Sequence, residues 1–295
     1  MPHSSLAAWH ALHDDASDPI DQRTRFASTA GVVTALLLAA LSLGGLLWPS
    51  AYAGETASWR AQAIAQDWFD LVVAAPALMV VSLWSRRGPH GSLRARLVQA
   101  GLLLYTLYVA AIYAFAIHLN ALFLLYCATL GLSIFALFAL APLRGDATRR
   151  QFDARLPNRV AGGFLIGVGA VFALLWLAQL APAAVDGRPP EGLVETGLFT
   201  NPIHVLDLSF ILPLHVIAGV LLWRGRDLGY ALGPVLLAFG AMMAASIGFL
   251  ALWISLDGAG GRSVPAAMAV LAAAAVVLLA LVLRSPRAHA AAGSK

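Results

Sequence analysis

The sequence predicts an all-α membrane protein with about eight transmembrane helices, and its composition, hydropathy and charge placement each indicate this. Apolar residues make up 60% of the 295 residues and charged residues only 12%. A soluble domain carries about 25% charged residues, so this chain lacks the charge that a water-facing surface needs. The mean hydropathy of +0.79 agrees. The first partner that the sequence predicts is therefore the lipid bilayer.

Eight stretches are long and apolar enough to cross a bilayer as helices. A spanning helix needs about 20 mostly apolar residues, and helices satisfy their own backbone hydrogen bonds in lipid. The third and fourth stretches meet at a very short turn near Asn120 and should form an antiparallel hairpin. The predicted spans are residues 29–49, 63–85, 97–118, 120–141, 160–182, 202–223, 230–255 and 265–284.

Three segments outside the spans are interpreted as cytoplasmic. Residues 1–28 hold several His and Asp residues before any apolar run begins. A cleavable signal peptide would instead start with basic residues and run directly into a short apolar segment. We therefore interpret 1–28 as an N-terminal tail, 142–159 as a basic linker between two membrane halves, and 285–295 as a C-terminal tail.

The basic residues indicate the orientation of the helices. All but three of the 19 Lys and Arg residues fall on one side of the predicted spans, and Arg60, Arg188 and Arg262 fall on the other. Because cytoplasmic loops are enriched in Lys and Arg, both termini should be cytoplasmic, in a plasma or inner membrane. The same clusters account for the pI near 9.6. No basic face lies beside aromatic residues on a soluble module, so no nucleic-acid partner is expected.

The second and sixth predicted spans match each other in sequence. The stretch DWFDLVVAAPALMVVSLWSRRG, from Asp67, aligns without a gap with HVLDLSFILPLHVIAGVLLWRG, from His204. The alignment places Asp70 on Asp207 and Pro76 on Pro213. It indicates two four-helix repeats, 29–141 and 160–284, which point the same way because each has an even number of spans. Chance similarity between apolar helices is the alternative.

Polar residues inside these spans gather toward the extracytoplasmic side. An ionisable residue within a membrane helix is costly, and by default it indicates a functional site. Asp67 and Asp70 share a helix face, with Gln66 on the same stripe. The predicted substrate- or ion-binding residues are Asp67, Asp70, His118, Asn120, His204, Asp207 and His215.

The sixth span carries the deepest of these groups. His204, Asp207 and His215 fall within an arc of about 80° at roughly 100° per residue. We expect Asp70, His118, His204 and Asp207 to face one polar cavity, with His215 at its floor. His204 is the expected partner of Asp207, whereas Asp67 should lie where water reaches it. The alternative for an aspartate near a helix start is a cap on free N–H groups.

Other residues suggest how the helices are shaped and packed. Pro76 and Pro213 should interrupt their helices, because a proline removes a backbone donor. Tyr105 and Tyr108 share a face of the third span, and the Gly163 and Gly167 pair suits close helix contact. Aromatic residues near the predicted interfaces are typical of a membrane belt, and these are Trp48, Tyr52, Trp59, Trp68, Trp84 and Trp223.

Three classes of function fit this pattern. The first is a carrier of a small molecule or ion, which the paired interrupted helices favour because such helices often form transporter binding sites. The second is an intramembrane metalloenzyme, in which His118, His204, Asp207 and His215 would bind zinc and Asp67 or Asp70 would act as base. A haem held by two histidines is a variant of this class. The third is a non-catalytic accessory subunit.

The sequence favours the carrier over the enzyme. It contains no P-loop, GxSxG or HExxH motif. The only lysine is Lys295, so no spanning helix offers an amine for a Schiff base. Neither zinc nor haem is required by the pattern, and no feature of the sequence specifies an oligomeric state.

The predicted topology can be tested with reporter fusions. Fusions at Gly145 and Lys295 should report a cytoplasmic position, and a fusion at Asp186 an extracytoplasmic one, because of the charge distribution. An extracytoplasmic signal at Lys295 would mean that the number of spans is odd.

Overall fold

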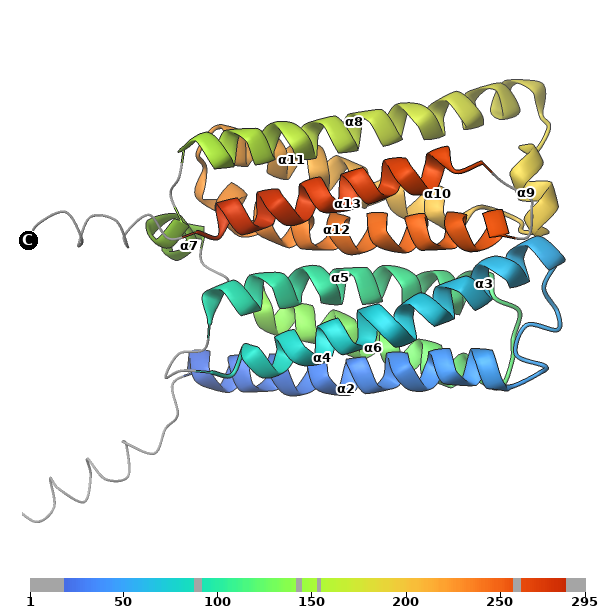
Figure 1. Cartoon of the computed structure of the whole chain (residues 1–295), viewed down its shortest axis with the longest axis horizontal. Helices are drawn as coiled ribbons and strands as arrows, with labels where there is room; N and C mark the ends of the chain where they lie inside the picture. The colour runs from blue at the N-terminus through green and yellow to red at the C-terminus, as the bar shows by residue number, and fades with distance from the viewer. Residues whose placement is uncertain (1–18, 88–91, 142–144, 153–154, 257–260, 285–295) are drawn as a thin grey trace, which may run out of the picture.

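The computed structural model describes residues 19–87, 92–141, 145–152, 155–256 and 261–284, and these residues form helices joined by turns (Figure 1). Eight helices are long and apolar enough to cross a membrane. The prediction of an all-α, multi-pass membrane protein is therefore confirmed.

Six of the eight spans are single helices, and two are interrupted. The single helices are α2 (Pro19–Leu47), α5 (Leu93–Ala116), α6 (Phe123–Leu140), α8 (Arg155–Asp186), α12 (Asp227–Leu256) and α13 (Ser263–Val282). The second span consists of α3 (Ala57–Phe69), η1 (Asp70–Ala74) and α4 (Ala75–Trp84). The sixth consists of α10 (Pro202–Leu206), η2 (Asp207–Ile211) and α11 (Leu212–Trp223). Short helices α7 (Gly145–Phe152) and α9 (Glu191–Thr196) lie outside the spans.

Several helices are longer than their predicted apolar cores. Helix α2 begins at Pro19, whereas the predicted span begins at residue 29. Helix α8 extends past the predicted 160–182 at both ends. Hydropathy detects only the part of a helix that lies in hydrocarbon, and a helix continues through polar turns beyond it. The predicted linker 142–159 accordingly includes α7 and the first turn of α8.

The spans pack as two groups of four that meet along α5 and α12 (Figure 1). Helix α5 is the most buried of the eight spans. At Gly101 of α5, a Cβ atom would lie 2.5 Å from the carbonyl oxygen of Val235 on α12. Only a glycine permits so close an approach, so this residue helps to bring the two groups into contact.

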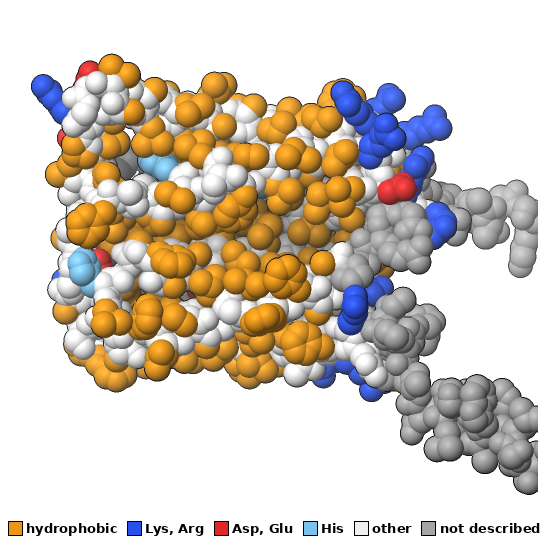
Figure 2. Space-filling view, turned by 180° about the vertical axis from the view of Figure 1, so that it is seen from behind, with side chains coloured by type: hydrophobic (Ala, Val, Ile, Leu, Met, Phe, Trp, Pro, Cys, Tyr) orange, Lys and Arg blue, Asp and Glu red, His pale blue; other side chains and the backbone are white. Residues whose placement is uncertain are grey.

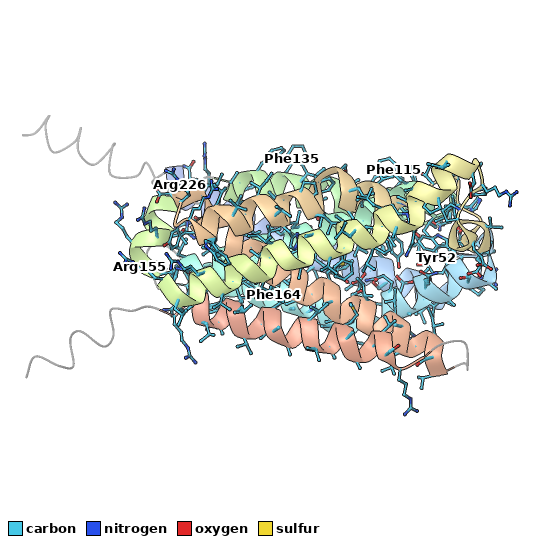
Figure 3. The ribbon with its side chains drawn as sticks, turned by 90° about the horizontal axis from the view of Figure 1, so that it is seen from above. Tyr52, Phe115, Phe135, Arg155, Phe164 and Arg226 are labelled. Carbon is cyan, nitrogen blue, oxygen red and sulfur yellow. The ribbon has the colours of Figure 1, made fainter. Side chains whose placement is uncertain are left out.

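The face of the bundle seen in Figure 2 is largely apolar, and each of the eight spans carries exposed large hydrophobic side chains. Phe115 is 82% exposed, and it projects outward with Phe135 (Figure 3). A contiguous exposed apolar surface of this extent indicates contact with lipid. Lys and Arg side chains gather at one end, where α2 begins and α13 ends (Figure 2). We refer to this as the arginine-rich end, and Tyr52 lies at the opposite end (Figure 3).

The two interrupted helices contain π-helical turns at matching positions. The N–H of Ala75 bonds to the carbonyl of Asp70, and the N–H of Leu212 bonds to that of Asp207. Pro76 and Pro213 follow directly and have no N–H to continue the ordinary ladder. The predicted interruption thus takes the form of a widened turn that begins at each aspartate. Such π-bulges are frequent at functional sites.

Helices α8 and α11 make a close backbone contact in the second group. A Cβ on Gly219 would lie 2.6 Å from the carbonyl oxygen of Gly162, and a Cβ on Gly162 would lie 2.7 Å from that of Gly219. The sequence indicated Gly163 and Gly167 instead. Gly163 faces the Trp223 ring, but Gly167 has open space where its side chain would be.

Replacing Gly219 should therefore destabilise the protein. Gly219→Ala forces α8 and α11 apart, and overpacking of this kind costs about 1–3 kcal/mol. The unfolding midpoint in detergent should fall. Gly167→Ala is the matched control and should leave the midpoint unchanged or raise it, since alanine favours a helix. Equal midpoints for the two variants would contradict the close contact at Gly219.

Candidate functional site

Three aspartates are buried within the spans. Asp67 and Asp70 are fully buried, and Asp207 is 9% exposed. Each accepts hydrogen bonds from neutral side chains only. Among the described residues, no Lys, Arg or His side chain forms an ion pair with any of the three. A buried charge without a partner is very costly, so this arrangement is unusual for a structural site.

Helix α5 supplies a tyrosine to each aspartate. The Tyr105 hydroxyl donates to Asp70 Oδ1 at 2.7 Å, and the Tyr108 hydroxyl donates to Asp207 Oδ1 at 3.0 Å. Tyr105 and Tyr108 are three residues apart and share a helix face, as the sequence predicted. One face of α5 therefore binds an aspartate from each of the two helix groups.

Asp67 lies at the crossing of α2, α3 and α5, and the expectation that water reaches it is wrong. The Tyr52 hydroxyl donates to its Oδ2 at 2.6 Å, and the Tyr113 hydroxyl donates to Oδ1 at 3.0 Å. Burial raises the pKa of the Tyr52 hydroxyl, and the nearby Asp67 charge adds to this, so Tyr52 keeps its proton. A Cβ on Gly45 of α2 would collide with the Asp67 carboxylate.

Asp70 joins the two helix groups through a polar chain. Its Oδ1 also accepts from Gln66 Nε2 at 2.9 Å, which is the pairing indicated by their spacing. Gln66 Oε1 in turn accepts from the Ser246 hydroxyl on α12 at 2.9 Å. The second oxygen of Asp70, Oδ2, has no hydrogen-bond partner among the described residues.

Asp207 is held by residues from two other helices, and the expectation that His204 is its partner is wrong. Besides Tyr108, the indole N–H of Trp176 on α8 donates to Asp207 Oδ2 at 2.8 Å. The His204 ring instead lies against the Trp176 ring, with centroids 4.6 Å apart. The sequence placed His204 and Asp207 on one side of the helix, but the indole occupies the space between that side and α8.

His215 is buried two helical turns below Asp207. Its Nδ1 lies 2.8 Å from the carbonyl oxygen of Ile211. Because a carbonyl can only accept, Nδ1 carries a hydrogen, and in the neutral ring Nε2 is left as an acceptor. The Cβ position of Gly240 on α12 is 3.8 Å from this Nε2.

Asp207 and His215 line a cavity of about 90 Å³, here called the inner cavity. Its walls are aromatic and aliphatic side chains from α5, α8, α12 and α13. A second cavity of about 760 Å³, the end cavity, opens beside α9 and is lined by His204. Trp176 and Ile203 line both, so they form the partition between them. The expectation of a single cavity is therefore wrong: Asp207 and His215 line the inner cavity, His204 lines the end cavity, and Asp70 lines neither.

His118 and Asn120 belong to neither cavity. The backbone N–H of His118 donates to Glu55 Oε1 at 2.7 Å, and its Nδ1 lies 3.0 Å from the same oxygen, while the side chain is 66% exposed. The Asn120 amide donates to the carbonyl of Ala51 at 2.8 Å. Both residues fasten the turn between α5 and α6 to the loop before α3.

The proposed zinc or haem ligands are not brought together. The described residues contain no group of three or more His, Cys, Asp or Glu side chains that could hold a metal ion. His118 lies in a loop against Glu55. His204 and His215 are eleven residues apart on one span, which corresponds to about 16 Å along a helix. Two ligands this far apart on one helix cannot bind the same ion.

Sequence reasoning missed two of the residues that contact the aspartates, Tyr52 and Trp176, and also Ser246, which contacts Gln66. Tyr52 was assigned to the membrane belt, but it is buried and bound to Asp67. Trp176 lies inside its apolar span rather than at an edge, which is uncommon for tryptophan and could have indicated a special role. Ser246 gave no signal, because serine is not unusual in a packed helix.

No family model matches this chain, and neither a curated protein nor a solved structure is similar to it at a significant level.

The Asp67 cluster predicts a stability effect. Asp67→Ala leaves the buried hydroxyls of Tyr52 and Tyr113 without their acceptor, at about 1–3 kcal/mol for each unsatisfied group. The unfolding midpoint in detergent should fall sharply. Asp67→Asn should lower the midpoint much less. Its amide oxygen remains an acceptor for the Tyr113 hydroxyl, and the Tyr52 hydroxyl can rotate to accept from the amide N–H. Asp186→Ala, at an exposed site, is the control. A midpoint for Asp67→Ala equal to that of the control would show that the cluster does not stabilise the fold.

Proposed function

We propose that this protein is a carrier that moves a small molecule or ion across the membrane, with the inner cavity as its binding site. The observation that carries the proposal is the group of buried aspartates that have only neutral partners among the described residues. Asp207 lines the inner cavity and begins the widened turn of an interrupted helix.

The energetics favour a functional role for these aspartates. A charged aspartate at the centre of a membrane helix costs about 3 kcal/mol on insertion scales. Hydrogen bonds from Tyr108 and Trp176 reduce this cost but supply no positive charge. The balancing charge must then come from a bound proton or cation. An asparagine could hold the helices together without burying a charge, so the presence of an acid supports binding of a positively charged species.

The arrangement of the two halves also supports a carrier. The π-helices η1 and η2 begin at Asp70 and Asp207, the same positions that align in the sequence match. We propose that residues 29–141 and 160–284 are parallel repeats whose axis passes between α5 and α12. Carriers are commonly built from such repeats, with the binding site near the contact between them.

The two cavities fit one closed state of such a carrier. With the arginine-rich end in the cytoplasm, the end cavity faces the extracytoplasmic side. It would serve as a vestibule, separated from the inner cavity by Trp176 and Ile203. Transport would then require movement of this partition and, in turn, opening toward the arginine-rich end.

Cysteine accessibility tests this function without knowledge of the solute. Cys127 is the only cysteine, so Cys127→Ser gives a cysteine-free background. Met243→Cys then places one thiol in the inner cavity. In oriented vesicles, a membrane-impermeant thiol reagent should modify it from both sides, because a carrier exposes its site to each side in turn.

The control places the cysteine at Ala136, which is fully buried and away from both cavities. Ala136→Cys should remain unmodified from either side. Modification of the Met243→Cys thiol from one side only, or from neither, would exclude alternating exposure and favour an accessory subunit.

A further inference from the structure

The polar atoms that the inner cavity leaves unused are hydrogen-bond acceptors. The two donors in its wall, the Tyr108 hydroxyl and the Trp176 indole, are both directed at Asp207. His215 uses its Nδ1 hydrogen on Ile211, which leaves Nε2 as an acceptor in the neutral ring. A matching ligand must therefore bring N–H or O–H donors. It must also carry a positive charge, because Asp207 has no positively charged partner among the described residues.

The walls of the inner cavity suit an organic cation better than a metal ion. Phe164, Phe172 and Phe239 line it together with Tyr108 and Trp176. Aromatic faces attract an organic cation and pack against its hydrocarbon part. A hard metal cation such as Ca²⁺ takes six to eight oxygen ligands. Among its side chains, the cavity offers oxygen only from Asp207 and Tyr108. An anion would face the negative carboxylate and the negative faces of the rings.

The size of the cavity limits the ligand to a few heavy atoms. One water molecule needs about 15 Å³ of cavity volume. The inner cavity, at about 90 Å³, therefore has room for roughly six groups of the size of a water molecule. Asp207 lies two helical turns from His215, so the two residues are at different depths in the cavity. Gly240 is at the depth of His215. The ligand thus has a charged head at Asp207 and room for a short chain that extends toward Gly240.

We infer that the inner cavity binds a small primary alkylammonium ion of about four carbons. The ammonium group would donate to the Asp207 carboxylate, and the alkyl chain would lie between Phe172 and Phe239 with its end above Gly240. This inference rests on the proposed carrier function and names the class of solute carried.

Binding of matched probes to the purified protein in a non-ionic detergent tests this inference. Isothermal titration at neutral pH compares n-butylammonium with 1-butanol, which has the same chain without the charge, and with methylammonium, which has the charge without the chain. We expect n-butylammonium to bind at least tenfold more tightly than either. Equal affinity for n-butylammonium and 1-butanol, or no binding of n-butylammonium, would overturn the inference.

Two variants locate the ligand in the cavity. Asp207→Asn keeps the shape of the side chain but not its charge, and should weaken n-butylammonium at least tenfold. Gly240→Ala adds a methyl group 3.8 Å from His215 Nε2, an ordinary contact that should not disturb the fold. This variant should weaken the binding of n-butylammonium and leave the binding of methylammonium unchanged. If the variants leave the affinity for n-butylammonium unchanged, the ligand binds elsewhere.

The result of the binding test can be distinguished from the result of the carrier test. Failure of every ammonium probe, with the Met243→Cys thiol still modified from both sides, would reject the solute class and keep the carrier. Modification from one side only, with tight n-butylammonium binding, would keep the site and reject transport.

Discussion

The fold depends on a few hydrogen bonds from hydroxyls to carboxylates in a medium without water. Tyr105 and Tyr108 project from one face of α5 and donate to acids in different helix groups. An acid that lost its tyrosine would lose a hydrogen-bond donor in the buried interior, and burying a polar group with fewer hydrogen bonds is costly. The position of α5 between the two groups is therefore set by polar contacts as well as by packing.

The widened turns explain how the acids reach that position. In an ordinary helix, Pro76 and Pro213 would clash with the preceding turn and leave a carbonyl without its donor. The π-helical turns at Asp70 and Asp207 absorb this defect over one turn. Each aspartate thus begins a locally distorted segment, and the same feature that accommodates a proline also places an acid on the inner side of its helix.

The sequence predicted what depends on local pattern. Apolar runs identified the eight spans, the two prolines identified the interruptions, and spacing identified the pairing of Gln66 with Asp70. The sequence did not predict contacts in which the partner comes from another segment of the chain. The position of Asp67 near a helix start suggested contact with water, but the loop that carries Tyr52 folds over it. Periodicity shows which residues share a face of one helix, and it cannot show which neighbour will cover that face.

The contact between Trp176 and Asp207 links the partition between the two cavities to the hydrogen bonding of the acid. The same indole closes the partition between the cavities and donates to Asp207 Oδ2. A carboxylate oxygen has two lone pairs, so Oδ2 can accept from the indole N–H and from a second donor in the inner cavity. Movement of the indole away from this position would open the partition and at the same time remove a donor from Asp207.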